Sequence, residues 1–312
     1  MRAFIFPGQG SQKVGMGADL AEASVHAREL FEEVDDALGQ KLFQLMKDGP
    51  AEELTLTENA QPAIMALSMA VIRVLEKEGG VKLADVAGYV AGHSLGEYSA
   101  LCAAGAIPVA ETARLLKLRG QAMQRAVPVG EGAMAALLGA DVAKAEDLAE
   151  AAEADGEICT VANDNDPGQV VISGHKAAID RAVAMVKDHG IKRGVLLPVS
   201  APFHCPLMKP AAEEMEKALA ETAIRAPSVP LYANVTAEAV SDPDVIRELL
   251  VDQVTGRVRW RESVLAMHQG GAERFIEIGG KVVGPMVGRT VTDAEVMSVQ
   301  SMDDIEALIK SL

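Results

Sequence analysis

The sequence Gly-His-Ser-Leu-Gly at residues 92–96 constrains the fold of this chain more than any other segment. It fits the pattern Gly-x-Ser-x-Gly, which places a serine on a sharp turn between a strand and a helix. An apolar stretch at 86–91 precedes it and small residues at 97–104 follow it, as that turn requires. Glycine is favoured beside the serine because strand and helix nearly touch there. The pattern predicts that Ser94 is a nucleophile; a glycine-flanked turn with a solvated serine is the alternative.

Composition limits the classes of protein and partner. The chain has 312 residues, 49% of them hydrophobic, which predicts a globular protein of about two structural units. Its formal net charge of −16 argues against nucleic acid and anionic membrane as partners. The longest apolar run, 62–72, is too short to span a bilayer. Three cysteines show neither metal-ligand spacing nor an even disulfide set, so we expect a cytoplasmic protein without a metal site.

Strand and helix signals alternate over residues 1–128, with a strand at 3–6, a helix opened by Pro62 and a strand at 86–91. This alternation predicts an α/β fold with a parallel sheet covered by helices. From 129 to 198 the order becomes strand, helix, strand, strand, helix, strand, which is ferredoxin-like. We therefore predict a small βαββαβ subdomain at 129–198, inserted into a larger α/β unit formed by 1–128 and 199–312.

A serine nucleophile needs a base within hydrogen-bond reach, and the chain offers six histidines. His204 is the best candidate because it stands in a loop, 199–206, at the carboxyl end of a predicted strand, where α/β active sites are built. Pro202 and Pro206 stiffen that loop. His93 belongs to the turn itself, so we expect its ring to point away from Ser94. A structural role for His204 is the alternative.

No acidic residue on a strand-end loop before His204 completes a triad. Asp164 and Asp166 lie in a turn-rich segment, and we interpret both as turn formers. A backbone or side-chain carbonyl is then the remaining way to orient the imidazole.

Arg119 carries the information about the substrate. In the predicted helix 111–125 it has leucines behind it and Ala122 and Met123 ahead at helical spacing, so it lies on the apolar face. A buried guanidinium must be paired, because burying it alone is costly. Two interpretations stay open at this point, an internal salt bridge and a bidentate clamp for a substrate carboxylate. The loop Gly8–Gly10 is likewise either a tight turn or a place where the Gln9 backbone N–H meets a reacting carbonyl.

Taken together and in order, these motifs resemble the malonyl-CoA:acyl-carrier-protein transacylase family along nearly the whole chain. Gly279, Gly280 and Lys281 depart from it, since the family has Gly-Pro-Gly-Lys there. The matching segments are Phe-Pro-Gly-Gln-Gly-Ser-Gln at 6–12, Gln-Pro-Ala at 61–63, Gly-His-Ser-Leu-Gly-Glu-Tyr at 92–98, Leu-Arg-Gly at 118–120, Asn-Asp-Asn-Asp-Pro-Gly-Gln-Val-Val-Ile-Ser-Gly at 163–174 and Phe-His at 203–204.

The resemblance implies an α/β-hydrolase-like core with a ferredoxin-like insert. It implies a Ser94–His204 dyad whose histidine is oriented by the backbone carbonyl of Gln253, and an oxyanion hole from the backbone N–H groups of Gln9 and Leu95. Arg119 would bind the substrate carboxylate. Beside the resemblance, our own hypothesis is that Phe203, directly before the histidine, narrows the pocket near malonate C2 and disfavours a methyl branch there. Asn163 is our second candidate for a pocket residue.

The implied reaction is transfer of malonate from malonyl-CoA to the phosphopantetheine thiol of acyl carrier protein through malonyl-Ser94, without a cofactor, by a monomer. The alternatives are a serine hydrolase or thioesterase, a non-catalytic carrier-binding module, and an acyltransferase of a polyketide or malonate decarboxylase system. The acidic carrier protein would need a local basic rim on this acidic chain. Our candidates for that rim are Lys192, Arg193, Lys281 and Arg289.

Overall fold

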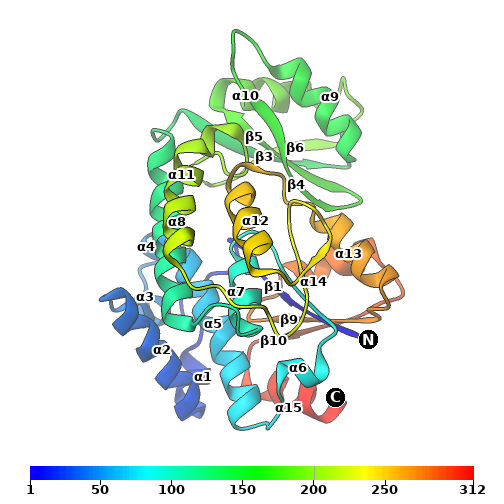
Figure 1. Cartoon of the computed structure of the whole chain (residues 1–312). Helices are drawn as coiled ribbons and strands as arrows, with labels where there is room; N and C mark the ends of the chain where they lie inside the picture. Colours follow the sequence, from blue (N-terminus) through cyan, green and yellow to red (C-terminus); the bar gives the residue numbers. More distant parts are fainter. Residues whose placement is uncertain (200) are drawn as a thin grey trace.

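The computed structural model describes residues 1–199 and 201–312, so Ser200 of the predicted histidine loop lies outside the description. Two sheets organise the chain, one of six strands and one of four. Figure 1 shows the four-stranded sheet and its helices as a green cap at one end of the molecule. The chain enters this cap from the end of α8 (Val109–Ala126) and leaves it after β6 (Arg193–Leu196).

The six-stranded sheet has the order β10-β9-β1-β2-β7-β8. All neighbours pair in parallel except β7 and β8, which form an antiparallel edge. This confirms the predicted α/β fold with a parallel sheet. Its strands are β1 (Arg2–Phe6), β2 (Tyr89–Gly92), β7 (Leu231–Tyr232), β8 (Ala239–Val240), β9 (Arg274–Ile278) and β10 (Glu295–Val299).

Helices cover both faces of this sheet, as the alternation along β1 requires. Phe4 and Phe6 belong to the core cluster shared with α5 and α8, whereas Ala3 and Ile5 pack into the cluster formed with α13 and α14. The helices outside the cap are α1 (Ala18–Ala23), α2 (Val25–Leu38), α3 (Leu42–Asp48), α4 (Ala51–Thr55), α5 (Thr57–Lys77), α6 (Leu83–Val86), α7 (Gly96–Ala103), α8, α11 (Lys209–Glu221), α12 (Pro243–Thr255), α13 (Trp260–Gln269), α14 (Val283–Thr290) and α15 (Met302–Ser311), with a 3-10 turn η1 at Pro206–Met208.

The prediction that Pro62 opens its helix is wrong, because α5 begins at Thr57 and holds Pro62 in its interior. Tertiary contacts stabilise the extra turn before the proline. Lys117 of α8 forms an ion pair with Glu58 at 2.9 Å. At Gly120 the two helices approach so closely that an added Cβ would lie 2.6 Å from the Thr57 carbonyl oxygen. Packing against α8 therefore sets the start of α5.

The cap contains a four-stranded sheet with the order β4-β5-β3-β6 and antiparallel pairing throughout. This is the ferredoxin-like arrangement that the sequence predicts. Its helices bury their apolar faces on one side of the sheet, in a core cluster separate from the other two. The elements are β3 (Gly132–Leu138), α9 (Val142–Ala152), β4 (Cys159–Asp166), β5 (Gln169–His175), α10 (Lys176–Met185) and β6.

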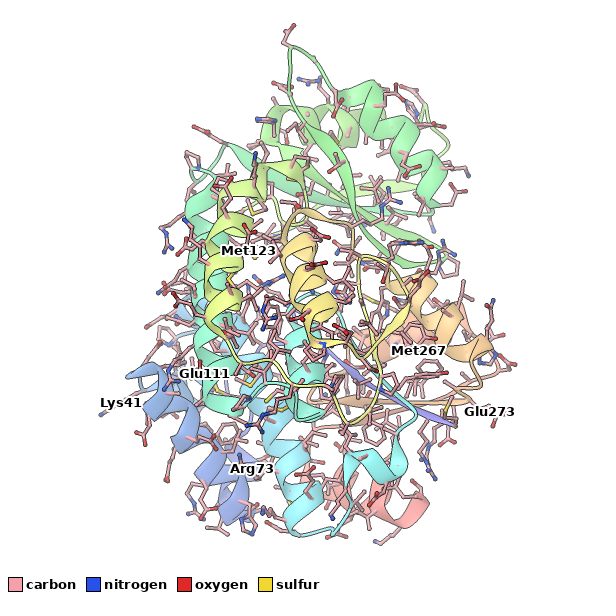
Figure 2. All side chains as sticks on the ribbon, viewed as in Figure 1. Lys41, Arg73, Glu111, Met123, Met267 and Glu273 are labelled. Atoms are coloured by element: carbon pink, nitrogen blue, oxygen red, sulfur yellow. The ribbon has the colours of Figure 1, made fainter. Side chains whose placement is uncertain are left out.

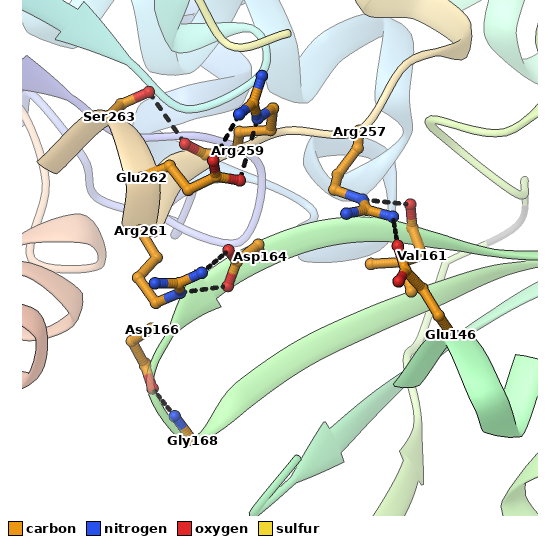
Figure 3. A network of polar contacts seen from close by, with 10 residues as sticks. All are labelled: Glu146, Val161, Asp164, Asp166, Gly168, Arg257, Arg259, Arg261, Glu262 and Ser263. Atoms are coloured by element: carbon orange, nitrogen blue, oxygen red, sulfur yellow. Dashed lines mark hydrogen bonds and ion pairs between the residues drawn. The ribbon is translucent and has the colours of Figure 1, made fainter. Parts of the chain in front are cut away.

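The end of β4 joins the cap to the rest of the molecule, as Figure 3 shows. Asp164 is buried and faces Arg261 of α13, whose Nε donates to Oδ1 at 3.0 Å while Nη2 lies 2.8 Å from Oδ2. Asp166 forms an ion pair with Arg289 of α14 at 2.8 Å. Asp166 also accepts a hydrogen bond from the Gly168 N–H at 3.0 Å, as a turn former does. The turn-former interpretation is wrong for Asp164, which lies within the strand and serves the ion pair.

Candidate active site

Ser94 stands at the sharp turn between β2 and α7, where the sequence pattern places it. Its φ of 54° is in the left-handed region, which residues with a side chain rarely adopt. The flanking glycines allow the close approach. A Cβ on Gly92 would lie 1.9 Å from the Gly96 carbonyl, and a Cβ on Gly96 would lie 2.4 Å from the Phe6 carbonyl oxygen. Both glycines are therefore required by sterics.

His204 reaches Ser94 from the loop before η1. Its Nε2 lies 2.7 Å from Ser94 Oγ, and its Nδ1 lies 2.8 Å from the backbone carbonyl oxygen of Gln253 in α12. Because a carbonyl oxygen only accepts, Nδ1 carries the proton and Nε2 offers its lone pair to the serine hydroxyl. This tautomer is the one that a general base for Ser94 requires. The carbonyl occupies the place that an acidic residue takes in a triad.

Burial keeps the imidazole neutral. Desolvation, reinforced by the nearby positive charge of Arg119, lowers the pKa of His204 to about 3. A histidine with a lowered pKa is deprotonated at neutral pH and is available to accept the Ser94 proton. Its φ of 56° is also left-handed, so both members of the pair sit in conformations that the surrounding structure must hold.

Arg119 of α8 is buried beneath the pair, with 1% of its surface exposed. Its Nη1 donates to Gln61 Oε1 at 2.9 Å, and its Nη2 donates to Gln253 Oε1 at 2.7 Å and to Ser94 Oγ at 3.1 Å. The guanidinium also lies 5.7 Å from the centre of the Tyr98 ring. No carboxylate within the described residues forms an ion pair with it, so the internal salt bridge considered from the sequence is absent there.

Two backbone donors lie beside Ser94. The N–H groups of Gln9 and Leu95 have no hydrogen-bond partner within the described part of the chain, and both residues line the same cavity. Leu95 precedes the first turn of α7, where the helix dipole favours negative charge. Such free N–H groups are suited to an oxyanion.

The cavity that contains these groups has a volume of about 280 Å³ and opens between the cap and the rest of the molecule. Phe203 and Asn163, the two residues predicted to line a pocket, both line it. Met123 contributes from α8; Figure 2 shows it toward the end of that helix nearer the cap, with Glu111 near the other end. Most of the lining is apolar, which suits a flexible acyl chain or arm more than a phosphate.

His93 bonds to the cap and also lines the cavity, so the expectation that its ring points away from Ser94 stays a prediction. Its Nε2 lies 2.8 Å from Oδ1 of Asn165 in β4, so the nucleophile turn is also linked to the cap. Sequence reasoning missed Asn165 and two fully buried residues below the turn, Glu97 and Asn234. Asn234 follows the end of β7, and a polar residue at the carboxyl end of a parallel strand was the available signal. Glu97 directly follows the Gly-His-Ser-Leu-Gly motif, which was the signal for it.

The candidate basic residues Lys192, Arg193, Lys281 and Arg289 are all exposed, and none of them lines the cavity. Lys281 directly precedes the lining residues Val282 and Val283, whereas Lys192 and Arg193 lie at the Leu138 end of β6. Arg289 already pairs with Asp166. Within the described residues, no group of three or more His, Cys, Asp or Glu side chains could hold a metal ion. No helix there is long and apolar enough to cross a membrane.

Comparisons with known proteins agree on one family. The model of the acyl transferase domain matches residues 3–302. The malonyl CoA-acyl carrier protein transacylase of Escherichia coli (strain K12) is 45% identical over 311 residues, covering 99% of this chain and 98% of that protein.

Solved structures give the same result. The acyl-carrier-protein-S-malonyltransferase of Bartonella henselae superimposes with a TM-score of 0.97 at 52% identity, covering 99% of this chain and 98% of that one. A malonyl-transacylase solved in complex with its type II PKS acyl-carrier protein superimposes with a TM-score of 0.95 at 39% identity, covering 100% of this chain and 99% of that one.

Proposed function

This chain belongs to the acyl transferase family, among the malonyl CoA-acyl carrier protein transacylases, and from that premise we propose the reaction that its site performs. The enzyme transfers the malonyl group of malonyl-CoA to the phosphopantetheine thiol of acyl carrier protein. Transfer proceeds through a malonyl ester of Ser94 and supplies malonate for fatty acid elongation. The observation that carries the proposal is the buried Arg119, which lacks a carboxylate partner in the described structure and donates to Ser94 Oγ.

In the first half-reaction, Ser94 Oγ attacks the thioester carbonyl while His204 Nε2 takes its proton across the 2.7 Å hydrogen bond. The N–H groups of Gln9 and Leu95 stabilise the tetrahedral oxyanion. His204 then returns the proton to the departing coenzyme A sulfur. The malonate carboxylate pairs with Arg119, whose planar guanidinium matches a carboxylate in a bidentate geometry.

In the second half-reaction, the carrier-protein thiol occupies the place that coenzyme A has left. His204 accepts the thiol proton as the sulfur attacks malonyl-Ser94, and the same two N–H groups hold the second oxyanion. His204 then protonates Ser94 Oγ as the ester breaks. One base and one oxyanion hole thus serve both half-reactions, as a ping-pong exchange between two thiols requires.

The proposal has three finer parts: where the carrier protein docks, that the enzyme works as a monomer, and that it is located in the cytoplasm. The exposed Lys192, Arg193 and Lys281 would meet the acidic carrier protein. Ser94, His204 and Arg119 come from one chain, which supports a monomer. A cytoplasmic location would keep the three buried cysteines as thiols, the state in which they stand here.

A transfer assay tests the proposal directly. The purified protein is mixed with malonyl-CoA and either the holo or the apo form of acyl carrier protein, and the carrier mass and free malonate are measured. We expect malonylation of the holo form only, with hydrolysis far slower than transfer. Release of malonate at the same rate with either carrier would identify a hydrolase and contradict the proposal.

A further inference from the structure

Side-chain amides bond three consecutive peptide units of the nucleophile turn. Asn234 Nδ2 donates to the Gly92 carbonyl oxygen at 2.7 Å, and Asn234 Oδ1 accepts the Ser94 N–H at 2.8 Å. Gln253 Nε2 donates to the Ser94 carbonyl oxygen at 2.9 Å. The Asn234 carboxamide therefore bridges the turn on both sides of His93.

Asn234 is itself fixed by burial and by hydrogen bonds of its own backbone. It is fully buried in the loop after β7, the strand beside β2, and it does not line the cavity. Its backbone N–H donates to Glu97 Oε2 at 3.3 Å, and its carbonyl accepts from the Arg259 N–H at 2.9 Å. With backbone and side chain both bonded, its carboxamide is a fixed template for the turn.

The turn needs such a template because Ser94 is left-handed. A side-chain-bearing residue keeps a positive φ only where the surroundings over-determine it. The bonds of the turn also determine the direction of the Leu95 N–H. In a planar trans peptide the N–H points opposite to the C=O, so the Gln253 bond to the Ser94 carbonyl turns the Leu95 N–H the other way, into the cavity.

We propose that Asn234 is a positioning residue for acylation: its carboxamide holds Ser94 in the left-handed conformation that aims Oγ at His204, and that lets the Gln253 bond direct the Leu95 N–H at the oxyanion. The inference rests on the proposed function, because it concerns the rate at which malonyl-Ser94 forms. Asn234 does not line the cavity, so it acts through the backbone of Gly92 and Ser94.

The first test compares Asn234→Ala with a matched control, Asn59→Ala. Asn59 is also buried and also links separate elements, with bonds to the Glu53 carbonyl, to Gln40 and to Lys117, but neither it nor any of these three partners lines the cavity. Single-turnover malonylation of Ser94 is measured for both, with thermal unfolding alongside. We expect Asn234→Ala to acylate about 100-fold more slowly with KM for malonyl-CoA within about threefold, because misplaced reacting groups cost about that much. The control should acylate within about twofold of the wild type.

The second test uses Asn234→Asp, which keeps the shape of the side chain. When protonated, the new carboxyl can donate to the Gly92 carbonyl oxygen and accept the Ser94 N–H, as the amide does. When ionised, it loses the donor. Burial raises the pKa of such a carboxyl, so the ratio of variant to wild-type acylation rate should rise as the pH falls. The corresponding ratio for Asn234→Ala should stay flat.

The outcomes separate the two claims. If the wild type forms no malonyl-Ser94, the proposed function fails. If the wild type acylates normally and Asn234→Ala acylates as fast as Asn59→Ala, the positioning role is overturned. The positioning role is also overturned if the ratio of Asn234→Asp to wild-type acylation rate does not change with pH. If Asn234→Ala does not fold, this pH profile alone decides.

Discussion

Arg261 and Arg119 both extend from helices toward buried polar groups, but they differ in what they meet. Arg261 of α13 pairs with the buried carboxylate of Asp164, and its own side chain keeps 29% of its surface exposed. Arg119 of α8 is 1% exposed and meets two glutamine amides and the Ser94 hydroxyl. Arg261 has its ion-pair partner within the described chain, and Arg119 does not.

This difference in pairing indicates a structural role for Arg261 and a functional role for Arg119. A buried charge without an opposite charge is costly, so a fold that keeps one has a use for it. At the seam, which is the contact between the end of β4 and helix α13, the Asp164–Arg261 ion pair links the cap to the rest of the molecule, as Figure 3 shows. In the cavity, the proposed function gives Arg119 a carboxylate partner in the acyl group. We expect loss of the first pair to reduce stability and loss of the second charge to reduce malonyl transfer.

The largest expected effect is that of Arg119→Ala. Malonyl transfer should fall about 1000-fold in kcat/KM, because truncation removes the buried cation that we propose binds the substrate carboxylate. Transfer of an acetyl group should stay within about tenfold of the wild type. Rates with malonyl-CoA and acetyl-CoA are compared, with Arg119→Lys as the charge-conserving control. Equal losses for both substrates would assign Arg119 a structural role like that of Arg261.

The next effect is that of Asp164→Asn at the seam. The change leaves Arg261 without its carboxylate and should lower the free energy of unfolding by about 2 kcal/mol, which is less than for a fully buried pair because Arg261 is partly solvated. Urea unfolding measures it. The ratio of malonyl to acetyl transfer should not change. A changed ratio with unaltered stability would show that the two sites are not distinct.

A smaller effect is the pH dependence of malonyl binding. Burial raises the pKa of Glu97 to about 7, although Gln253 and Arg119 favour its ionised form. As the pH rises through this range Glu97 loses its proton, and the new negative charge near Arg119 opposes the substrate carboxylate. KM for malonyl-CoA should therefore rise about threefold between pH 6 and pH 8, a modest coulombic effect within the interior. In Glu97→Gln this rise should vanish; its persistence would assign it to another group.

The smallest effect concerns the exposed Arg193, which has no ion-pair partner within the described residues. Arg193→Glu should raise KM for holo carrier protein about fivefold at low salt and leave KM for malonyl-CoA unchanged, as expected for a charge at the rim of an interface. Lys310→Glu on α15, at the opposite end of the molecule from the cap, is the control. Similar effects of the two variants would refute a local docking role.

The sequence predicts the fold and the central site because local signals carry them. The glycines around Ser94 reflect a close approach that only glycine permits, and Arg119 is revealed by its position on an apolar helix face. Other features depend on partners distant in the chain. From the local sequence Asp164 is interpreted as a turn former, because its ion-pair partner Arg261 lies 97 positions later in the chain. Asn234 and the true start of α5 are fixed in the same way by tertiary contacts.

Intact-mass measurement after mixing with malonyl-CoA tests the central claim most directly. The wild type should gain one malonyl group on Ser94, lose it on addition of holo carrier protein, and keep it with apo carrier protein. Ser94→Ala should gain nothing, and Arg119→Ala should gain acetyl from acetyl-CoA far more readily than malonyl from malonyl-CoA. A wild-type protein that remains unmodified, or an Arg119→Ala variant that is malonylated as fast as the wild type, would contradict the account.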